Sequence, residues 1–267
     1  MSATGANAQS ASELPLPGRH GRFVHDGVER AYLVVAPTTA VPPAARTLLL
    51  MLHGCTQDAT DAARGTRLHE AAAGQGMTVV YAEQPAARQP QKCWTWYSAA
   101  ETTRGAGEVA FLAALALKVA TDEGIPATQI GVAGISAGGA MAANLLYAYP
   151  DVFRAAAVHS GVAAFAARDL PSGLAAMRAG PLDIDAISGA AHSAAPAELM
   201  TQVAIMGVHG AVDAVVAPVN LDALLAQAAQ VARARGIPAT TERVLVDGLG
   251  HAWSGGSSSG TFTDAAR

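Results

Sequence analysis

The sequence of 267 residues predicts a single α/β domain with a mostly parallel central sheet flanked by helices. Short apolar runs alternate with helical segments of 10–17 residues, and this alternation is typical of βαβ units. The run at 47–52 is continuously apolar, as strands buried in a parallel sheet are. No internal repeat and no second alternation pattern occurs, so the length fits one domain.

The predicted elements follow one another along most of the chain. Residues 28–35 are expected to form an edge strand, and the helix at 107–123 is closed by Gly124 and Pro126. The helix at 137–148 ends before Pro150. The predicted strands are 28–35, 47–52, 77–81, 130–133, 155–159, 203–207 and 241–246, and the predicted helices are 60–74, 107–123, 137–148 and 219–235.

The catalytic domain is predicted to cover residues 20–267, after a flexible N-terminal leader at 1–19 that is rich in Ser, Ala, Gly and Pro. The leader has neither a charged n-region nor an apolar h-region, so no signal peptide is visible. Segment 161–200 is rich in small residues and has weak helical periodicity. We therefore expect an insertion there, and not a rigid lid.

Composition argues against two classes of partner. The chain has 17 Lys+Arg and 21 Asp+Glu, a net charge of -4 and only 14% charged residues. It has no basic stripe, which argues against nucleic acid. No apolar run reaches the roughly 18 residues of a membrane-spanning helix.

Cys55 and Cys93 are too few for a usual zinc site; they form either two buried thiols or one disulfide.

The segment GISAGG at 134–139 holds the strongest candidate nucleophile, Ser136. It follows a predicted strand and precedes a predicted helix, and a nucleophile on such a turn projects its hydroxyl above the sheet. The next amide, that of Ala137, lies at a helix N-terminus, where the helix dipole favours negative charge. The alternative is a Gly/Ser turn that only links strand to helix.

A serine nucleophile needs a base and an acid that orients the base, and in this arrangement the acid and then the histidine follow the serine. His251, just past the last predicted strand, is the predicted base. His209 directly follows the preceding strand and is expected to shape its turn. A surface-loop histidine is the alternative for His251.

Two carboxylates compete for the role of the acid. Asp213 follows the strand at 203–207, whereas Asp247 lies four residues before His251 on the same loop. The orienting carboxylate usually comes from a different loop, so we favour Asp213. Asp183 and Asp185, in the insertion, are expected to be solvated.

Backbone amides are expected to stabilise the developing oxyanion. The loop HGCTQ at 53–57 follows the strand at 47–52, and its Cys55 amide is the expected donor beside that of Ala137. Each such donor is worth roughly 3–4 kcal/mol of barrier. His53 is either catalytic or fixes this loop, and its position before Ser136 favours the structural role.

Five ordered motifs carry a resemblance to a known family. They are LHGCTQ at 52–57, CWTWY at 93–97, GISAGGAMA at 134–142, VHSG at 158–161 and GHAWSGG at 250–256. From residue 20 to 264 the chain resembles the polyhydroxybutyrate depolymerase-type esterases, which are α/β-hydrolases related to some feruloyl and acetylxylan esterases.

The resemblance implies a triad of Ser136, Asp213 and His251, and a disulfide between Cys55 and Cys93 beside the active site. Many members are secreted, which suits a disulfide, so an extracellular protein is expected.

Two features depart from the family pattern. Ala211 stands where an acidic residue is usual, and relatives continue past residues 263–264 into an amphipathic helix, so one sheet edge is expected to be less covered.

Three tryptophans, Trp94, Trp96 and Trp253, are candidates for substrate binding. Each is either core mass or a flat ring that stacks on an ester at an open cleft. Trp94 and Trp96 follow Cys93, and Trp253 lies two residues from His251. We expect at least one of them to contact substrate.

The sequence therefore predicts a serine carboxylesterase that hydrolyses a polyester or another hydrophobic ester through an acyl-enzyme. We expect no cofactor, no metal, no membrane or nucleic-acid partner, and a monomer. The main alternative is a feruloyl or acetylxylan esterase that acts on plant cell-wall esters. Two further alternatives are a peptidase and a ligand-binding homologue without turnover. Burst release from a nitrophenyl ester would distinguish the esterase from the ligand-binding homologue.

Overall fold

The computed structural model describes residues 16–267. Its strands are β1 (Arg19–His25), β2 (Val28–Val35), β3 (Thr47–Leu52), β4 (Met77–Ala82), β5 (Ile130–Ile135), β6 (Ala155–His159), β7 (Val203–Gly210), β8 (Ala239–Val246), β9 (Trp253–Ser254) and β10 (Thr263–Asp264). Its helices are α1 (Ala59–Thr66), α2 (Leu68–Ala73), α3 (Ala99–Thr102), α4 (Gly107–Asp122), α5 (Ala137–Ala148), α6 (Leu170–Ala179), α7 (Ile184–Ser193) and α8 (Val219–Arg235). Residues 1–15 of the predicted leader lie outside the described residues.

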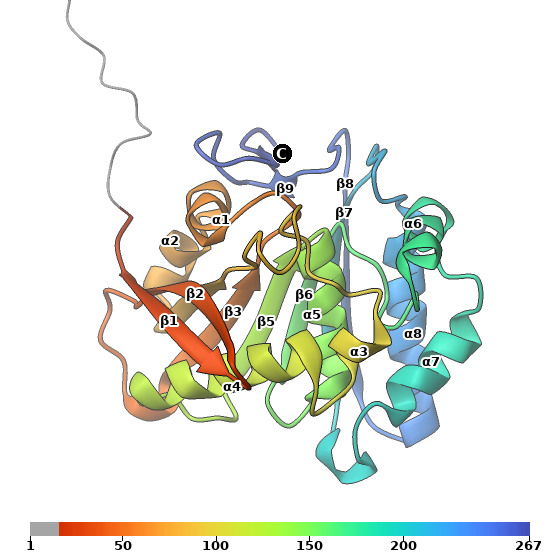
Figure 1. Ribbon diagram of the computed structural model, residues 1–267, viewed down its shortest axis with the longest axis horizontal. Helices are drawn as coiled ribbons and strands as arrows, with labels where there is room; N and C mark the ends of the chain where they lie inside the picture. Colours follow the sequence, from red (N-terminus) through yellow and green to blue (C-terminus); the bar gives the residue numbers. More distant parts are fainter. Residues whose placement is uncertain (1–15) are drawn as a thin grey trace, which may run out of the picture.

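The first eight strands form one central sheet in the order β1-β2-β4-β3-β5-β6-β7-β8 (Figure 1). The pairs from β4 to β8 are parallel, and β1 and β2 are antiparallel to their neighbours. The predicted α/β class with a mostly parallel sheet is confirmed. Parallel strands end at one common edge of the sheet, so the loops after β3, β5 and β7 meet there.

Helices cover both faces of this sheet because its strands alternate apolar side chains between the two faces. On one face, Leu48, Leu50 and Leu52 join the larger core with α4, α5, α7 and α8. On the other face, Met51 packs with apolar residues of α1 and α2. Every residue of α5 is buried, so the helix that follows Ser136 is held on all sides.

One stretch of the second face is open. A shallow hollow of about 480 Å³ is lined by residues of β3, β5, β6, β7 and β8, among them Leu49, Ala157 and Met206. Gly131, Ala155 and Ala157 contribute little side-chain bulk to its lining. In the part of the chain that the structure describes, no helix is long and apolar enough to span a membrane.

Two expectations from the sequence were wrong. Residues 28–35 form the second strand and not the edge, because the preceding segment β1 pairs with β2 along its whole length. The predicted helix at 60–74 is divided into α1 and α2, because Arg67 adopts a left-handed conformation with φ 52°.

The segment 161–200 contains two capped helices, α6 and α7. The Ser172 amide donates to the Asp169 carboxylate, and the Asp169 amide donates to the Ser172 hydroxyl oxygen; the two bonds form a capping box. Asp183, expected to be solvated, caps α7 by accepting the amide of Ala186 at 2.9 Å. The segment is therefore ordered by its caps, although its periodicity is weak.

Candidate active site

Ser136 occupies a sharp turn between β5 and α5. Its backbone has φ 57° and ψ -120°, a conformation that is costly for a residue with a side chain. The amide of Ser136 donates to the His159 carbonyl at 2.9 Å, which holds the turn against β6. A Cβ at Gly138 would lie 2.2 Å from the Leu52 carbonyl oxygen, so only glycine lets α5 start this close to β3.

A chain of hydrogen bonds joins the predicted serine, histidine and acid. His251 Nε2 lies 2.9 Å from Ser136 Oγ, and His251 Nδ1 lies 2.8 Å from Asp213 Oδ2. Asp213 follows β7 and is buried, whereas Asp247, the competing acid, is exposed. The structure thus brings Asp213, and not Asp247, to the far nitrogen of His251.

The Asp213 carboxylate is held by the loop on which it stands. Its Oδ1 accepts the amides of Val215 and Val216, both at 2.9 Å. Burial raises the pKa of Asp213, but the bonds from His251, Val216 and Val215 outweigh burial, so its pKa lies below the usual value. An ionised Asp213 fixes a proton on His251 Nδ1 and leaves Nε2 free to accept from Ser136.

Two further histidines, His159 and His209, support the triad, and the sequence analysis assigned no role to His159. His159 stacks on Trp253 with ring centroids 4.9 Å apart, and its Nε2 accepts the Ser254 amide at 3.2 Å. Burial is the main reason that the pKa of His159 is lowered to about 3, and the nearby His209 and His251 add to the effect. His159 therefore stays neutral. His209, as expected, shapes its turn: its Nε2 donates to the Val216 carbonyl at 2.9 Å.

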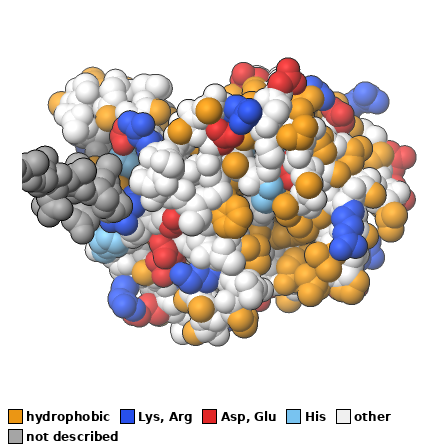
Figure 2. Space-filling view, turned by 90° about the horizontal axis from the view of Figure 1, so that it is seen from above, with side chains coloured by type: hydrophobic (Ala, Val, Ile, Leu, Met, Phe, Trp, Pro, Cys, Tyr) orange, Lys and Arg blue, Asp and Glu red, His pale blue; other side chains and the backbone are white. Residues whose placement is uncertain are grey.

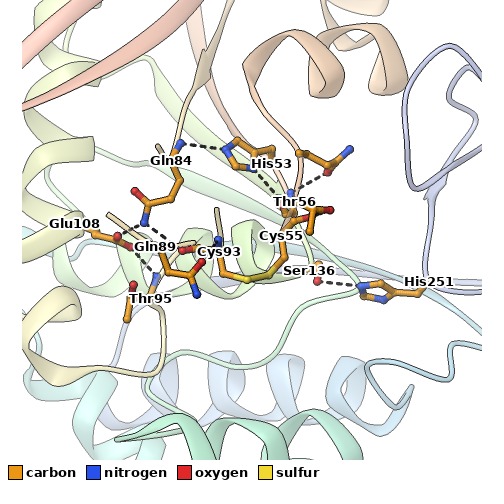
Figure 3. Close-up of a disulfide and its surroundings, with 12 residues drawn as sticks. His53, Cys55, Thr56, Gln84, Gln89, Cys93, Thr95, Glu108, Ser136 and His251 are labelled. Atoms are coloured by element: carbon orange, nitrogen blue, oxygen red, sulfur yellow. Dashed lines mark hydrogen bonds between the residues drawn. A yellow bond between two sulfur atoms is a disulfide. The ribbon is translucent and has the colours of Figure 1, made fainter. Parts of the chain in front are cut away.

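The two expected oxyanion donors lie beside Ser136. The Ala137 amide is the first N–H of α5, and neither it nor the Cys55 amide donates to another described residue. Cys55, Ala137 and Ser136 line the same small hollow. Cys55 is joined to Cys93 by the expected disulfide, with Cα atoms 4.2 Å apart (Figure 3). Both amides are therefore free to face a negatively charged oxygen.

Buried polar side chains fix the oxyanion loop (Figure 3). His53 Nδ1 donates to the Gly54 carbonyl at 2.7 Å, and its Nε2 accepts the Gln84 amide at 3.1 Å. Burial lowers the pKa of His53 to about 4, so it is neutral and structural. Gln57 Oε1 accepts the Gly54 amide at 2.9 Å. The expected loop-fixing role of His53 agrees with these contacts.

A buried carboxylate, Glu108 on α4, links this loop to the tryptophan segment. Glu108 accepts the Thr95 amide at 2.7 Å and a bond from the Gln84 side chain, whose Nε2 also donates to the Cys93 carbonyl at 3.1 Å. Burial raises the pKa of Glu108, while the charge of Arg30 opposes that rise. No local pattern marks Glu108, because its partners come from three other segments.

The three tryptophans differ in their surroundings. Trp94 is fully buried in the larger core, with the Arg30 guanidinium 5.3 Å from its ring centroid. Its ring has no surface to offer a substrate in this structure. Trp96 is 6% exposed and lines the hollow at Ser136. Trp253 is half-buried and stacks on His159, so its ring supports the loop of His251.

Comparison with known proteins places these features in a family. The family model described as "Esterase PHB depolymerase" matches residues 31–245. This chain belongs to that family. The expected resemblance to polyhydroxybutyrate depolymerase-type esterases is confirmed, and the match extends from β2 to β8, across the turn of Ser136 and the loop of Asp213.

Proteins similar to this chain include depolymerases and feruloyl esterases. The chain is 31% identical over 125 residues to poly(3-hydroxyalkanoate) depolymerase C of Paucimonas lemoignei, covering 45% of this chain and 28% of that protein. It is 33% identical over 135 residues to feruloyl esterase B of Neurospora crassa, covering 50% of this chain and 44% of that protein. The chain thus spans less than half the length of these relatives.

A solved structure supports the fold. Acetyl xylan esterase from Aspergillus awamori superposes with a TM-score of 0.74 at 18% identity, covering 88% of this chain and 94% of that chain. This family member therefore has the α/β-hydrolase fold, as the resemblance implied.

Proposed function

We propose that the chain is a serine carboxylic ester hydrolase that acts through an acyl-enzyme. The observation that carries the proposal is the continuous chain Ser136–His251–Asp213, with contacts of 2.9 and 2.8 Å, at the carboxyl edge of the sheet. Both outer members are held independently, Ser136 by the turn into α5 and Asp213 by two backbone amides. A ligand-binding protein without turnover would have no need of this arrangement.

The geometry supports a two-stage reaction. His251 Nε2 takes the Ser136 proton as Oγ attacks the ester carbonyl, and Asp213 stabilises the imidazolium that forms. The amides of Cys55 and Ala137 bind the oxyanion. His251 then gives its proton to the leaving alkoxide, and a water activated by the same nitrogen releases the acid from Ser136.

The substrate we propose is a polyester, polyhydroxyalkanoate-like or aromatic, or another hydrophobic ester. The depolymerase relative and the lining of the hollow at Ser136 by Trp96, Met177 and Val216 support this class. The feruloyl esterase relative supports the alternative, an esterase of plant cell-wall esters. The Cys55–Cys93 disulfide fits an oxidising compartment, so we propose an extracellular protein.

A substrate panel tests the proposal. Purified protein and its Ser136→Ala variant are compared on a nitrophenyl ester, poly(3-hydroxybutyrate), an aromatic polyester, a methyl ferulate and acetylated xylan. Hydrolysis of at least one ester that disappears in Ser136→Ala supports the esterase, and preference among the panel identifies the class. No turnover of any ester, or turnover that survives the substitution, contradicts it.

A further inference from the structure

Two cavities of very different size lie on either side of one short segment. The hollow at Ser136 has a volume of about 40 Å³, and Gly161 and Val162 line it. A second cavity of about 600 Å³ is lined by Phe165 and the two residues after it, together with side chains of α3, α6 and α7. Pockets that enclose drug-sized ligands measure roughly 300–1,000 Å³, so only the second cavity has room for a long substituent.

Helix α6 contributes to both cavities, so only a few residues separate them. Ala176 lines the larger cavity, and the next residue, Met177, lines the hollow. Trp96 also lines the hollow, and a Cβ at Gly173 would lie 3.2 Å from its ring, so the ring packs directly against α6. We call residues 161–165, Trp96 and Met177 the partition.

Asn144 on α5 bonds both sides of the partition. Its Nδ2 donates to the Trp96 carbonyl at 3.1 Å, and its Oδ1 accepts the Phe165 amide at 2.8 Å. Phe165 has φ 56°, a left-handed backbone conformation that is costly for a bulky residue. The bond to the buried Asn144 side chain stabilises that conformation. Since Trp96 lines the hollow and Phe165 the larger cavity, one side chain fixes a wall of each.

A second buried amide, that of Gln227 on α8, holds the residue before Phe165. Gln227 Oε1 accepts the Ala164 amide at 3.0 Å, and its Nε2 donates to the Ala164 carbonyl at 2.8 Å. The same Nε2 donates to the Ile187 carbonyl on α7 at 3.1 Å. Residues 161–165 form neither helix nor strand, so their backbone groups depend on such side chains for hydrogen bonds.

The larger cavity is suited to an apolar chain. Six alanines, Phe165 and Ile187 make up most of its lining. Its charged residues, Arg168, Asp169 and Asp183, are exposed. Figure 2 shows hydrophobic side chains gathered over the half of the molecule in which Figure 1 places α6 and α7. A carbon chain that passed the partition would therefore enter mostly apolar surroundings.

We propose that the partition, held by the buried amides of Asn144 and Gln227, limits the ester that reaches Ser136 to a short acyl group. Asn144 and Gln227 are thus positioning residues that determine specificity. The inference rests on the proposed function, because it assumes that Ser136 attacks an ester. An acetyl-sized group fits the hollow, whereas a long acyl chain needs the room of the larger cavity, which the partition closes off.

Acyl-length preference tests the partition. Hydrolysis of a nitrophenyl acetate and a nitrophenyl octanoate, which share a leaving group, is compared for the parent, Asn144→Ala and Gln227→Ala. The parent should have the higher kcat/KM on the acetate. Each variant should raise the octanoate-to-acetate ratio about tenfold, because burial of about two further methylene groups in the opened cavity is worth that factor. The gain should come mainly from a lower KM for the octanoate, since the added room binds the chain before attack.

Leu115→Ala is the matched control. Leu115 on α4 is fully buried in the larger core and lines neither cavity. Its truncation should lower the melting temperature and leave the partition in place, so the octanoate-to-acetate ratio should equal that of the parent. A shift in this control as large as in the amide variants would show that loss of stability alone changes the ratio, and would overturn the proposal.

Met177→Ala opens the partition from the side of α6 and removes neither amide. It should raise the same ratio, and it is the deciding variant if neither amide variant folds. An unchanged ratio in the folded amide variants or in Met177→Ala overturns the proposal, as does a parent that prefers the octanoate. A parent that hydrolyses no ester contradicts the proposed function, and this inference with it.

Discussion

Glu108 accepts the backbone amide of Thr95 at 2.7 Å, one residue before Trp96, and the same carboxylate bonds the Gln84 side chain. A single buried group thus ties the wall of the hollow to the loop of the proposed oxyanion donor. Arg30, equally buried, lies 3.4 Å from it. The positions of the Thr95–Trp96 segment and of the oxyanion loop therefore depend on the charged pair of Glu108 and Arg30.

Replacing Glu108 by Gln should destabilise the protein strongly. The substitution leaves the Arg30 charge buried without its partner, which typically costs about 3–5 kcal/mol. Urea denaturation measures the loss in the free energy of unfolding. The double variant Arg30→Met/Glu108→Gln removes both charges and should recover much of that loss. If Glu108→Gln unfolds like the parent, the pair does not hold these segments.

Reduction of the Cys55–Cys93 disulfide should lower both stability and turnover. The bridge spans a sequence separation of 38, and loop closure of that length is worth roughly 4 kcal/mol. Turnover should fall because the Cys55 amide loses its fixed position. Thermal unfolding and ester hydrolysis are measured with and without reductant. Cys93→Ser serves as the control, since it should already behave like the reduced protein. Two free thiols in denatured, non-reduced protein would contradict the bridge.

Stability should fall in acid partly because of His159. Its folded pKa, about 3, lies below the unfolded value of 6.5. Between these values only the unfolded chain takes up the proton, so stability is lost as the pH falls from 6.5 toward 3. At pH 5 the loss is about 2 kcal/mol for one such histidine. Urea denaturation of His159→Gln at pH 7 and pH 5 should show a smaller difference than the parent. An unchanged difference would mean that His159 titrates normally.

Asp213→Asn should lower kcat by roughly 10⁴, because the amide removes the charge that orients His251. Asp247→Asn, on an exposed neighbouring position, should leave kcat near that of the parent. Steady-state hydrolysis of a nitrophenyl ester compares the two. Greater damage from Asp247→Asn would mean that the acid has been misassigned.

Features whose residues are adjacent in the chain could be predicted from the sequence, whereas features formed by residues far apart in the chain could not. The turn at Ser136 was predictable because strand, glycines and helix are adjacent in the chain. Strand β1 was missed because its seven residues, RHGRFVH, are mostly polar. Helices α6 and α7 were missed because each is only 10 residues long and is made largely of small residues, and because their starts are set by the caps Asp169 and Asp183.

Buried polar groups were the least predictable part of the site. His159 contacts a residue 95 positions away, and Arg30 bonds a residue 78 positions away. No spacing rule links such positions, so only the folded chain brings them together. For the tryptophans, closeness in sequence was not informative. All three lie near Cys93 or His251 in the chain, but this did not determine which rings face the hollow.

The most direct test of the central claim is covalent labelling of the nucleophile. Protein is incubated with a nitrophenyl phosphonate, which reacts like an ester and stays on the serine that attacks it, and peptides are mapped by mass spectrometry. A single adduct on Ser136, formed with release of one nitrophenol and strongly slowed in His251→Ala, is the predicted result. Hydrolysis of esters by a protein that is labelled at another residue, or not labelled at all, would contradict the claim.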